Sequence, residues 1–216
     1  MAITPAVRLT GAILLALGMV LLVVFLATRP AWTGLTLEVD GEGHVLVAQA
    51  RGPSAEVPLG QRLIAIGDGQ RQLGLEALDL SIEPDGSMGD YVTWHRFLAR
   101  QQILSEMQAA PVLSLWTDAG EAIRIEPLPT RPIGSLPVSF WVQLVVGVMA
   151  WLISAAVFAV RPAESSARYL LLSGLATLTF APLAAVYSTR ELALPAISFQ
   201  WLNDLNHLGG TLFEQA

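Results

Sequence analysis

The sequence predicts an α+β protein in which a transmembrane α-helical region carries a small domain of strands and helices outside the bilayer. Two observations lead to this fold class. Uncharged apolar runs occupy residues 9–28, 138–160 and 169–189, and each is long enough for a helix to cross the hydrocarbon core, which takes about 20 residues. Residues 29–137, between the first two runs, carry ordinary globular sequence with charges, which belongs in water.

The charges of this chain are few and concentrated in one region. Only 14% of the residues are charged and the mean hydropathy is +0.55, whereas a soluble domain carries about 25% charge. Residues 29–139 hold 8 Arg and 14 Asp or Glu, and so the whole net charge of −6. This acidic balance argues against nucleic acid as a partner, because phosphates attract a basic surface. The chain has no Cys, which excludes disulfides, thiol catalysis and Cys-ligated metals, and no cofactor is expected.

The first apolar run predicts an uncleaved signal anchor, because it exceeds the length of about 7–15 residues typical of a signal peptide and no small-residue cleavage site follows it. The Arg-bearing loop 161–168 and Arg8 predict the cytoplasmic side, although Arg29 and Arg190 lie at the opposite ends of their spans. We therefore expect a multi-pass protein of the bacterial inner membrane, with its lipid bilayer as the first partner. The expected segments are a cytoplasmic N-terminus (1–8), spans at 9–28, 138–160 and 169–189, a periplasmic domain with its linker (29–137), a cytoplasmic loop (161–168), and an outer turn with a partial fourth span (190–216).

Alternating side chains predict strands in the exported domain. In residues 32–39, Leu35, Leu37 and Val39 point to one side, while polar residues point to the other. Glycines at 41 and 43 predict a tight turn that makes a hairpin with the next strand. The further predicted elements are strands at 44–50 and 62–66, a short helix at 52–56, an irregular stretch at 73–89 with a turn at 83–86, and a strand pair at 112–116 and 121–127.

Residues 90–109 predict the one long helix of the domain, because they contain no Gly or Pro. Asp90 is the expected N-cap and Pro111 the stop. Residues 128–137, with three Pro, predict a stiff linker into the second span. An apolar stripe at helical spacing consists of Tyr91, Trp94, Phe97, Leu98, Gln101, Leu104 and Met107.

This order of elements resembles a PDZ domain, over residues 32–127. Thr33-Gly34-Leu35 stands in the place of the carboxylate-binding loop, and Val45-Leu46-Val47-Ala48 in the hairpin strand. Residues 58–69 are similar to the family's most recognisable line, a polar loop leading into a buried strand that ends at an Asp-Gly turn. Gln61 departs from the Gly-Asp usual before that strand, and residues 73–89 are longer than the family's pattern. The resemblance implies a PDZ-like small β-barrel or sandwich.

A PDZ-like domain between a first span and a multi-span bundle also resembles the input region of bacterial sensor histidine kinases. The Arg-Pro-x-x-x-x-x-Arg turn at 161–168 is similar to theirs. In that family a dimerisation helix and an ATP-binding domain follow the bundle, and the resemblance is compatible with a homodimer. Neither part occurs in these residues, and none of the three His precedes an acidic residue. A kinase core is therefore expected beyond Ala216.

The candidate site is a peptide groove. The loop could offer backbone N–H groups to a peptide carboxylate, and the following strand could pair with the ligand. The alternative is an ordinary strand start beside the membrane. An aromatic stripe on the long helix is more often core than groove wall. The candidate ligand-binding residues are Trp32, Thr33, Gly34 and Leu35 from the loop, and Tyr91, Trp94, His95 and Leu98 from the helix.

Polar residues in the last apolar stretch form a second candidate. Asn203, Asp204 and His207 lie at or near membrane depth, where such groups are costly and usually face a bundle interior. They could sense protons or a ligand, or pack at the interface against helices outside this sequence. No His pair has metal spacing, and no Gly-x-Ser-x-Gly elbow predicts a nucleophile. The sequence predicts neither a metal site nor a catalytic residue.

Two function hypotheses follow. In the first, the chain is the sensory input module of a two-component histidine kinase, and a PDZ-like domain relays a peptide or envelope signal through the membrane. In the second, it is a membrane-anchored PDZ-type adaptor that binds protein C-termini for proteolysis or secretion. A membrane protease is the weakest reading, because His-Glu-x-x-His is absent.

Overall fold

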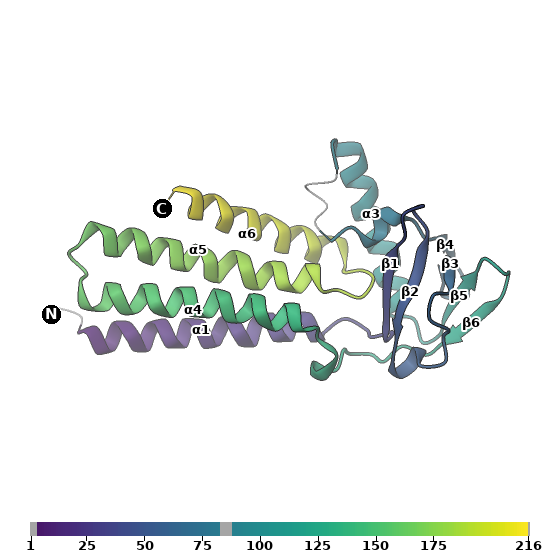
Figure 1. Ribbon diagram of the computed structural model, residues 1–216, viewed down its shortest axis with the longest axis horizontal. Helices are drawn as coiled ribbons and strands as arrows, with labels where there is room; N and C mark the ends of the chain where they lie inside the picture. Colours follow the sequence, from purple (N-terminus) through teal and green to yellow (C-terminus); the bar gives the residue numbers. More distant parts are fainter. Residues whose placement is uncertain (1–3, 83–87, 216) are drawn as a thin grey trace. The chain divides into compact units, whose positions relative to one another are not determined.

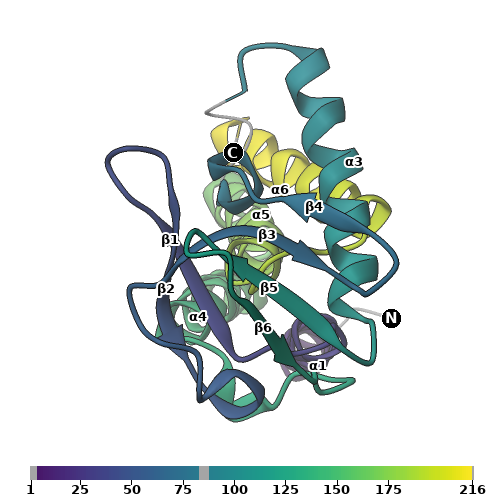
Figure 2. The same cartoon turned by 90° about the vertical axis from the view of Figure 1, so that its right-hand side faces the viewer.

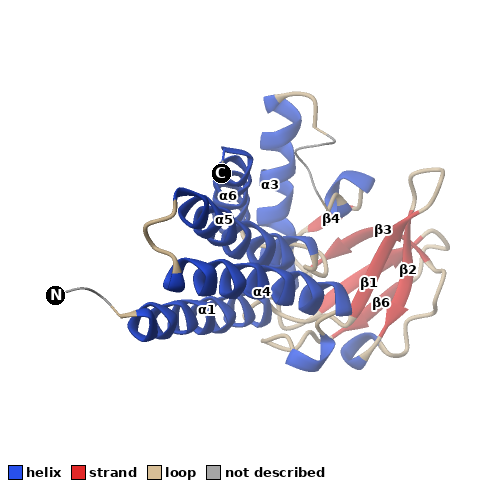
Figure 3. Ribbon diagram, turned by 60° about the vertical axis from the view of Figure 1, so that its left-hand side comes forward, coloured by secondary structure: helices blue, strands red, loops and turns tan. Residues whose placement is uncertain are grey.

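The computed structural model describes residues 4–82 and 88–215, which form two compact units (Figure 1). The helical unit takes in the described residues of Met1–Ala27, Leu136–Thr189 and Gln200–Ala216. The sheet unit comprises the described residues of Thr28–Ser135 together with Arg190–Phe199. The described strands, drawn in red in Figure 3, all belong to the sheet unit. The turn expected at residues 83–86 lies outside the described residues.

The apolar runs form long helices. Among the described residues, three helices are long and apolar enough to cross a membrane. The helix at Val138–Val160 has the same bounds as the predicted apolar run and lies between Pro137 and Arg161. The helix at Ser165–Ser188 begins four residues before the predicted run at 169, because backbone hydrogen bonds also form across the polar residues around Arg168. The three are α1 (Pro5–Thr28), α4 (Val138–Val160) and α5 (Ser165–Ser188), and the helical unit also holds most of α6 (Ala196–Gln215).

Small residues let these helices pack closely. Ala12 of α1 is buried in one cluster with Trp151 and Ala155 of α4. The Trp151 indole N–H donates to the Ala12 carbonyl oxygen over 2.8 Å, which satisfies a buried donor. Gly174 of α5 lies so close to Ser154 of α4 that a Cβ would not fit. Close backbone approach at small residues is typical of helices that pack within a membrane.

An antiparallel sheet of six strands forms the centre of the sheet unit (Figure 2). Its order is β1-β2-β3-β5-β6, and β4 also pairs with β3. The predicted α+β class is therefore confirmed as a mixed structure of helices and antiparallel sheet. The strands are β1 (Leu35–Val39), β2 (Val45–Ala50), β3 (Arg62–Gly67), β4 (Gln72–Gly74), β5 (Leu113–Thr117) and β6 (Ala122–Ile125).

The hairpin between β1 and β2 closes where the sequence predicts it. The Asp40 carboxylate accepts from the backbone N–H groups of Glu42 and His44, at 2.9 and 2.8 Å. Gly43 has a φ of +88°, a left-handed conformation that few other residues adopt. These contacts hold the turn, and Val39 pairs directly with Val45.

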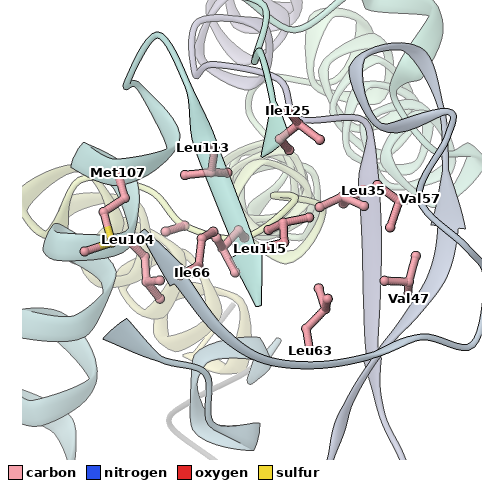
Figure 4. Packing of buried hydrophobic residues seen from close by; sticks show 12 residues of the cluster. Leu35, Val47, Val57, Leu63, Ile66, Leu104, Met107, Leu113, Leu115 and Ile125 are labelled. Carbon is pink, nitrogen blue, oxygen red and sulfur yellow. The ribbon is translucent and has the colours of Figure 1, made fainter. Parts of the chain in front are cut away.

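The long helix α3 (Tyr91–Gln108) packs on the core of the sheet unit. The Thr93 N–H donates to Asp90 Oδ1 over 2.7 Å, so Asp90 is the N-cap as predicted. Most of the predicted stripe is buried, but Tyr91 is 83% exposed, because it lies at the very first turn of the helix. The core itself brings together strand, helix and loop residues (Figure 4): Leu35, Val47, Val57, Leu63, Ile66, Leu104, Met107, Leu113, Leu115, Ile125, Leu192 and Ala193.

Short 3-10 turns occur in the stretches for which the sequence predicts a short helix, an irregular segment or a linker. The short helix expected at 52–56 is the single turn η1 (Gly52–Ser54), and the stretch after β4 holds η2 (Ala77–Leu80). A third turn, η3 (Ile133–Ser135), lies in the Pro-rich linker. Asp79 of η2 is fully buried, and its carboxylate is bonded by Arg100 of α3, with Nε to Oδ1 at 2.6 Å. This ion pair fastens η2 to the long helix.

Candidate functional site

A carboxylate is bound by the loop in front of β1, and it comes from the same chain. We name residues 32–35 the carboxylate loop and Arg190–Phe199, which belongs to the same compact unit, the strap. The backbone N–H of Thr33 donates to Glu191 Oε2 over 2.8 Å, and that of Gly34 donates to Oε1 over 3.1 Å. The Thr33 hydroxyl adds a third hydrogen bond, 3.0 Å to Oε2. Both oxygens of one carboxylate are therefore held by consecutive residues.

Local backbone geometry makes this loop a donor site. Gly34 has a φ of +80°, and a Cβ there would collide with the Arg51 carbonyl group. The Arg51 N–H donates to the Gly34 carbonyl oxygen at 2.8 Å, and the Ser54 hydroxyl donates to the Thr33 carbonyl oxygen at 2.7 Å. The Leu128 N–H donates to the Trp32 carbonyl oxygen at 2.9 Å. The Trp32 and Thr33 carbonyls share their peptide planes with the N–H groups of Thr33 and Gly34, so these contacts fix the planes that carry the two donors. Thr33 and Ser54 are 2% and 1% exposed.

Burial and hydrogen bonding act against each other at Glu191. Burial raises the pKa of the Glu191 carboxyl above its ordinary value, while the Thr33 and Gly34 donors and the charge of Arg131 act in the opposite direction. Arg131 is anchored in the linker, where its Nε donates to the Ser135 hydroxyl over 3.2 Å. The carboxylate loop therefore compensates part of the cost of taking a carboxyl group out of water.

Glutamine side chains of α3 hold the backbone of the strap. The N–H of Ala196 donates to Gln102 Oε1 at 3.0 Å. Longer hydrogen bonds of 3.4 Å run from Leu194 N–H to Gln101 and from Ala193 N–H to Gln108. Gln101 and Gln108 are themselves buried and fixed, since their amide groups donate to the carbonyl oxygens of Asp79 and Ala31. A helix side chain thus replaces the acceptor that a neighbouring strand would supply.

Aromatic rings hold the two ends of the strap. The Arg190 guanidinium lies 5.8 Å from the Phe97 ring centroid and 5.0 Å from that of Phe199. Its Nη2 also donates to the Ser81 carbonyl oxygen at 2.6 Å. Phe97 meets Phe199 edge-on at 5.1 Å and stacks on Trp94 at 5.9 Å. Such cation–π contacts add about 1 kcal/mol each when partly desolvated.

The four site residues predicted in the carboxylate loop lie in different environments. Thr33 and Gly34 contact the carboxylate, and Leu35 is buried in the core below them. Trp32 pairs with Leu128 in an isolated bridge, and its ring covers Gly52. The strand expected from residue 32 therefore begins only at Leu35.

The candidates on α3 separate by their burial. Leu98 is buried and Trp94 packs on Phe97, as expected of core residues. Tyr91 and His95 are exposed. The sequence does not predict the contacts of Glu191 and the three glutamines, because residues 190–216 read as an outer turn and a partial span. The only available signal was a lone acid between two apolar stretches.

The polar residues of α6 do not form one group. Asn203 is 3% exposed, whereas Asp204 and His207 are exposed. Asn206 donates from its amide to the Tyr187 hydroxyl of α5, at 3.0 Å. In the described part of the chain, no three His, Asp or Glu side chains gather as a group that could hold a metal ion.

Comparisons with known proteins give no family assignment to add to this geometry. No protein-family model, no curated protein and no solved structure matches the chain.

Proposed function

We propose that this chain is the membrane sensory input module of a signal-transducing protein of the two-component histidine kinase type, in which a PDZ-like extracytoplasmic domain detects a peptide or envelope signal. One observation carries the proposal: the Glu191 carboxylate is bound by the backbone N–H groups of Thr33 and Gly34. A loop that binds a side-chain carboxylate offers the same donors to the terminal carboxylate of a peptide.

The arrangement of the sheet unit supports the PDZ-like part of the proposal. The carboxylate loop runs into β1 at Leu35, and β1 is the first strand of a hairpin, as the resemblance implies. The single long helix α3 lies between β4 and β5 in the chain, and its side chains contact the strap that carries the bound carboxylate. Loop, hairpin and helix are the parts that a peptide groove requires.

The surface of the helical unit supports insertion into a bilayer. Soluble proteins rarely expose contiguous apolar patches above a few hundred Å². Along α1 and α4, however, large apolar side chains are exposed turn after turn: Ile13, Leu14, Leu17, Leu21, Phe25, Val142, Val145, Val146, Met149 and Ile153. Hydrocarbon chains are the solvent that suits such a surface.

Deletion of the extracytoplasmic domain tests the proposal. In cells that carry the whole gene, with any sequence after Ala216, replacing residues 32–127 by a Gly/Ser linker should abolish or lock the signal output. The measurement is a transcriptional reporter, with the amount of membrane-bound protein matched by immunoblot. Gly43→Ala, a change in an exposed turn where a Cβ meets nothing within 4 Å, is the control that should respond normally. An unaltered response after the deletion would contradict the proposal.

The adaptor hypothesis draws on the same loop, because a terminal carboxylate on a client protein would fit it equally well. The two functions differ in what binding does. An adaptor would capture C-terminal peptides and change the degradation or export of the bound protein, without altering any reporter output. A sensor would change the output while leaving the ligand intact.

A further inference from the structure

The carboxylate loop is occupied by the chain's own Glu191, and this occupancy has a consequence for any external ligand. We propose that Glu191 is an intramolecular competitor, so that a C-terminal carboxylate enters the loop only by displacing the strap. This inference rests on the proposed peptide-binding function. The donors of Thr33 and Gly34 already reach both oxygens of one carboxylate, at 2.8 and 3.1 Å, so they cannot serve two carboxylates at once.

The residues next to Glu191 indicate the class of ligand. Leu192 and Ala193 are 4% and 2% exposed, and both belong to the hydrophobic core of the sheet unit. A peptide that displaces them must refill this apolar space, because an unfilled cavity in a core costs about as much as the lost side chain. The ligand is therefore a peptide C-terminus whose last residue is aliphatic, with a free carboxylate.

The strap is not a strand of the sheet, so it can leave without breaking strand pairing. The described strands pair with one another and not with the strap. Its backbone is held instead by the side chains of Gln101, Gln102 and Gln108, over 3.0 to 3.4 Å. Breaking such side-chain contacts costs far less than breaking a ladder of backbone bonds in a core. Displacement of the strap therefore empties the core space of Leu192 and Ala193 but breaks no pairing between the described strands.

Detachment also changes the end of a helix. The Phe199 N–H donates to the Pro195 carbonyl oxygen at 2.9 Å, so the first turn of α6 is formed on strap residues. The strap follows α5 and leads into α6 without a break in the chain. A ligand that frees Glu191 therefore removes a constraint from the connection between two helices, which is a route for a signal.

Competition can be measured with the chain in lipid nanodiscs. A tethered ligand competes at an effective concentration in the millimolar range, and its removal restores the intrinsic affinity of the site. The probe is a fluorescent pool of seven-residue peptides, randomised at six positions and ending in leucine with a free carboxylate. The same pool with a C-terminal amide is the ligand control. We expect Glu191→Gln to bind the free-carboxylate pool about tenfold more tightly than the unchanged chain, and the exposed Glu121→Gln to bind it like the unchanged chain.

A second measurement uses the unchanged protein and does not depend on how the variant folds. Hydrogen exchange at the N–H groups of Ala193, Leu194 and Ala196 should accelerate when the free-carboxylate pool is added, and not when the amide pool is added. If the pool binds both proteins equally and leaves this exchange unaltered, the inference is overturned while the proposed function stands. If neither protein prefers the free carboxylate, the inference and the peptide-detecting part of the proposed function both fail.

Discussion

At the scale of single residues, Gly34 decides whether the carboxylate loop exists. Its φ of +80° is a conformation that L side chains rarely adopt, and its missing Cβ lets the Arg51 carbonyl oxygen approach the loop that binds Glu191. Gly43, in the β1–β2 turn, has a similar φ of +88° but an open surrounding. The two glycines therefore share the backbone requirement and differ only in the space around them.

This pair gives a matched prediction. Gly34→Ala should lower the free energy of unfolding by about 3 kcal/mol, because strain at positive φ and a clash with backbone add up. Gly43→Ala should cost about 1 kcal/mol, from the positive φ alone. Chemical unfolding in mild detergent, followed by the fluorescence of the sheet unit's tryptophans, measures both. Equal losses in the two variants would show that the approach of Arg51 is not tight.

At the scale of elements, a buried ion pair joins η2 to α3. The Asp79 side chain is fully buried and that of Arg100 is 11% exposed. Another ion pair of the same helix, Arg71 with Glu106 at 2.8 Å, has both side chains nearly half exposed. The two ion pairs have similar distances and differ in the burial of their side chains.

We therefore predict unequal costs for neutralising the two acids. Asp79→Asn removes the buried partner of the Arg100 charge, which keeps Glu76 at 3.0 Å and the Gly74 carbonyl oxygen, and should cost about 2 to 3 kcal/mol. Glu106→Gln should cost less than about 1 kcal/mol, because water screens the exposed pair. Unfolding midpoints of the two variants, measured side by side in the same detergent, test this order. A loss at Glu106 as large as that at Asp79 would contradict it.

The elements were largely predictable from sequence, whereas the occupied site was not. The length of the apolar run predicts the observed bounds of α4. Alternating side chains and glycines at the turn predict the β1–β2 hairpin. Both signals are local in the sequence. Thr33 and Gly34 were found through a resemblance in one short loop. Glu191 is 158 residues away from Thr33 in the chain, and no local pattern connects the two. Tertiary hydrogen bonds of this kind leave no periodicity to detect.

At the scale of the whole molecule, the absence of Cys makes the membrane topology directly measurable. The positive-inside rule predicts that residues 29–137 face outward and that the loop 161–168 faces the cytoplasm. A single cysteine introduced at an exposed position shows on which side of the membrane its region lies, and the chain has no other thiol to be labelled. Glu121 and Ala163 are exposed positions of this kind.

We expect a membrane-impermeant maleimide to label Glu121→Cys in intact spheroplasts. Ala163→Cys should be labelled only after the membrane is permeabilised. The unchanged chain, which has no thiol, is the blank, and gel mobility after labelling with a heavy maleimide is the readout. Labelling of both positions in intact spheroplasts, or of Ala163→Cys alone, would overturn the predicted orientation.

The glutamine contacts of α3 have a consequence for how this protein can diverge. Gln101, Gln102 and Gln108 accept hydrogen bonds from the main-chain N–H groups of Leu194, Ala196 and Ala193, and Gln101 also accepts one from Arg190 Nε over 3.2 Å. Any residue except proline supplies that N–H, and the proline of this segment, Pro195, stands between two of the bonded positions, where no N–H is used. Mutations at Leu194 and Ala196 are therefore restrained by packing alone. Among descendants of this chain, the three glutamines and Glu191 should change more slowly than Leu194 and Ala196.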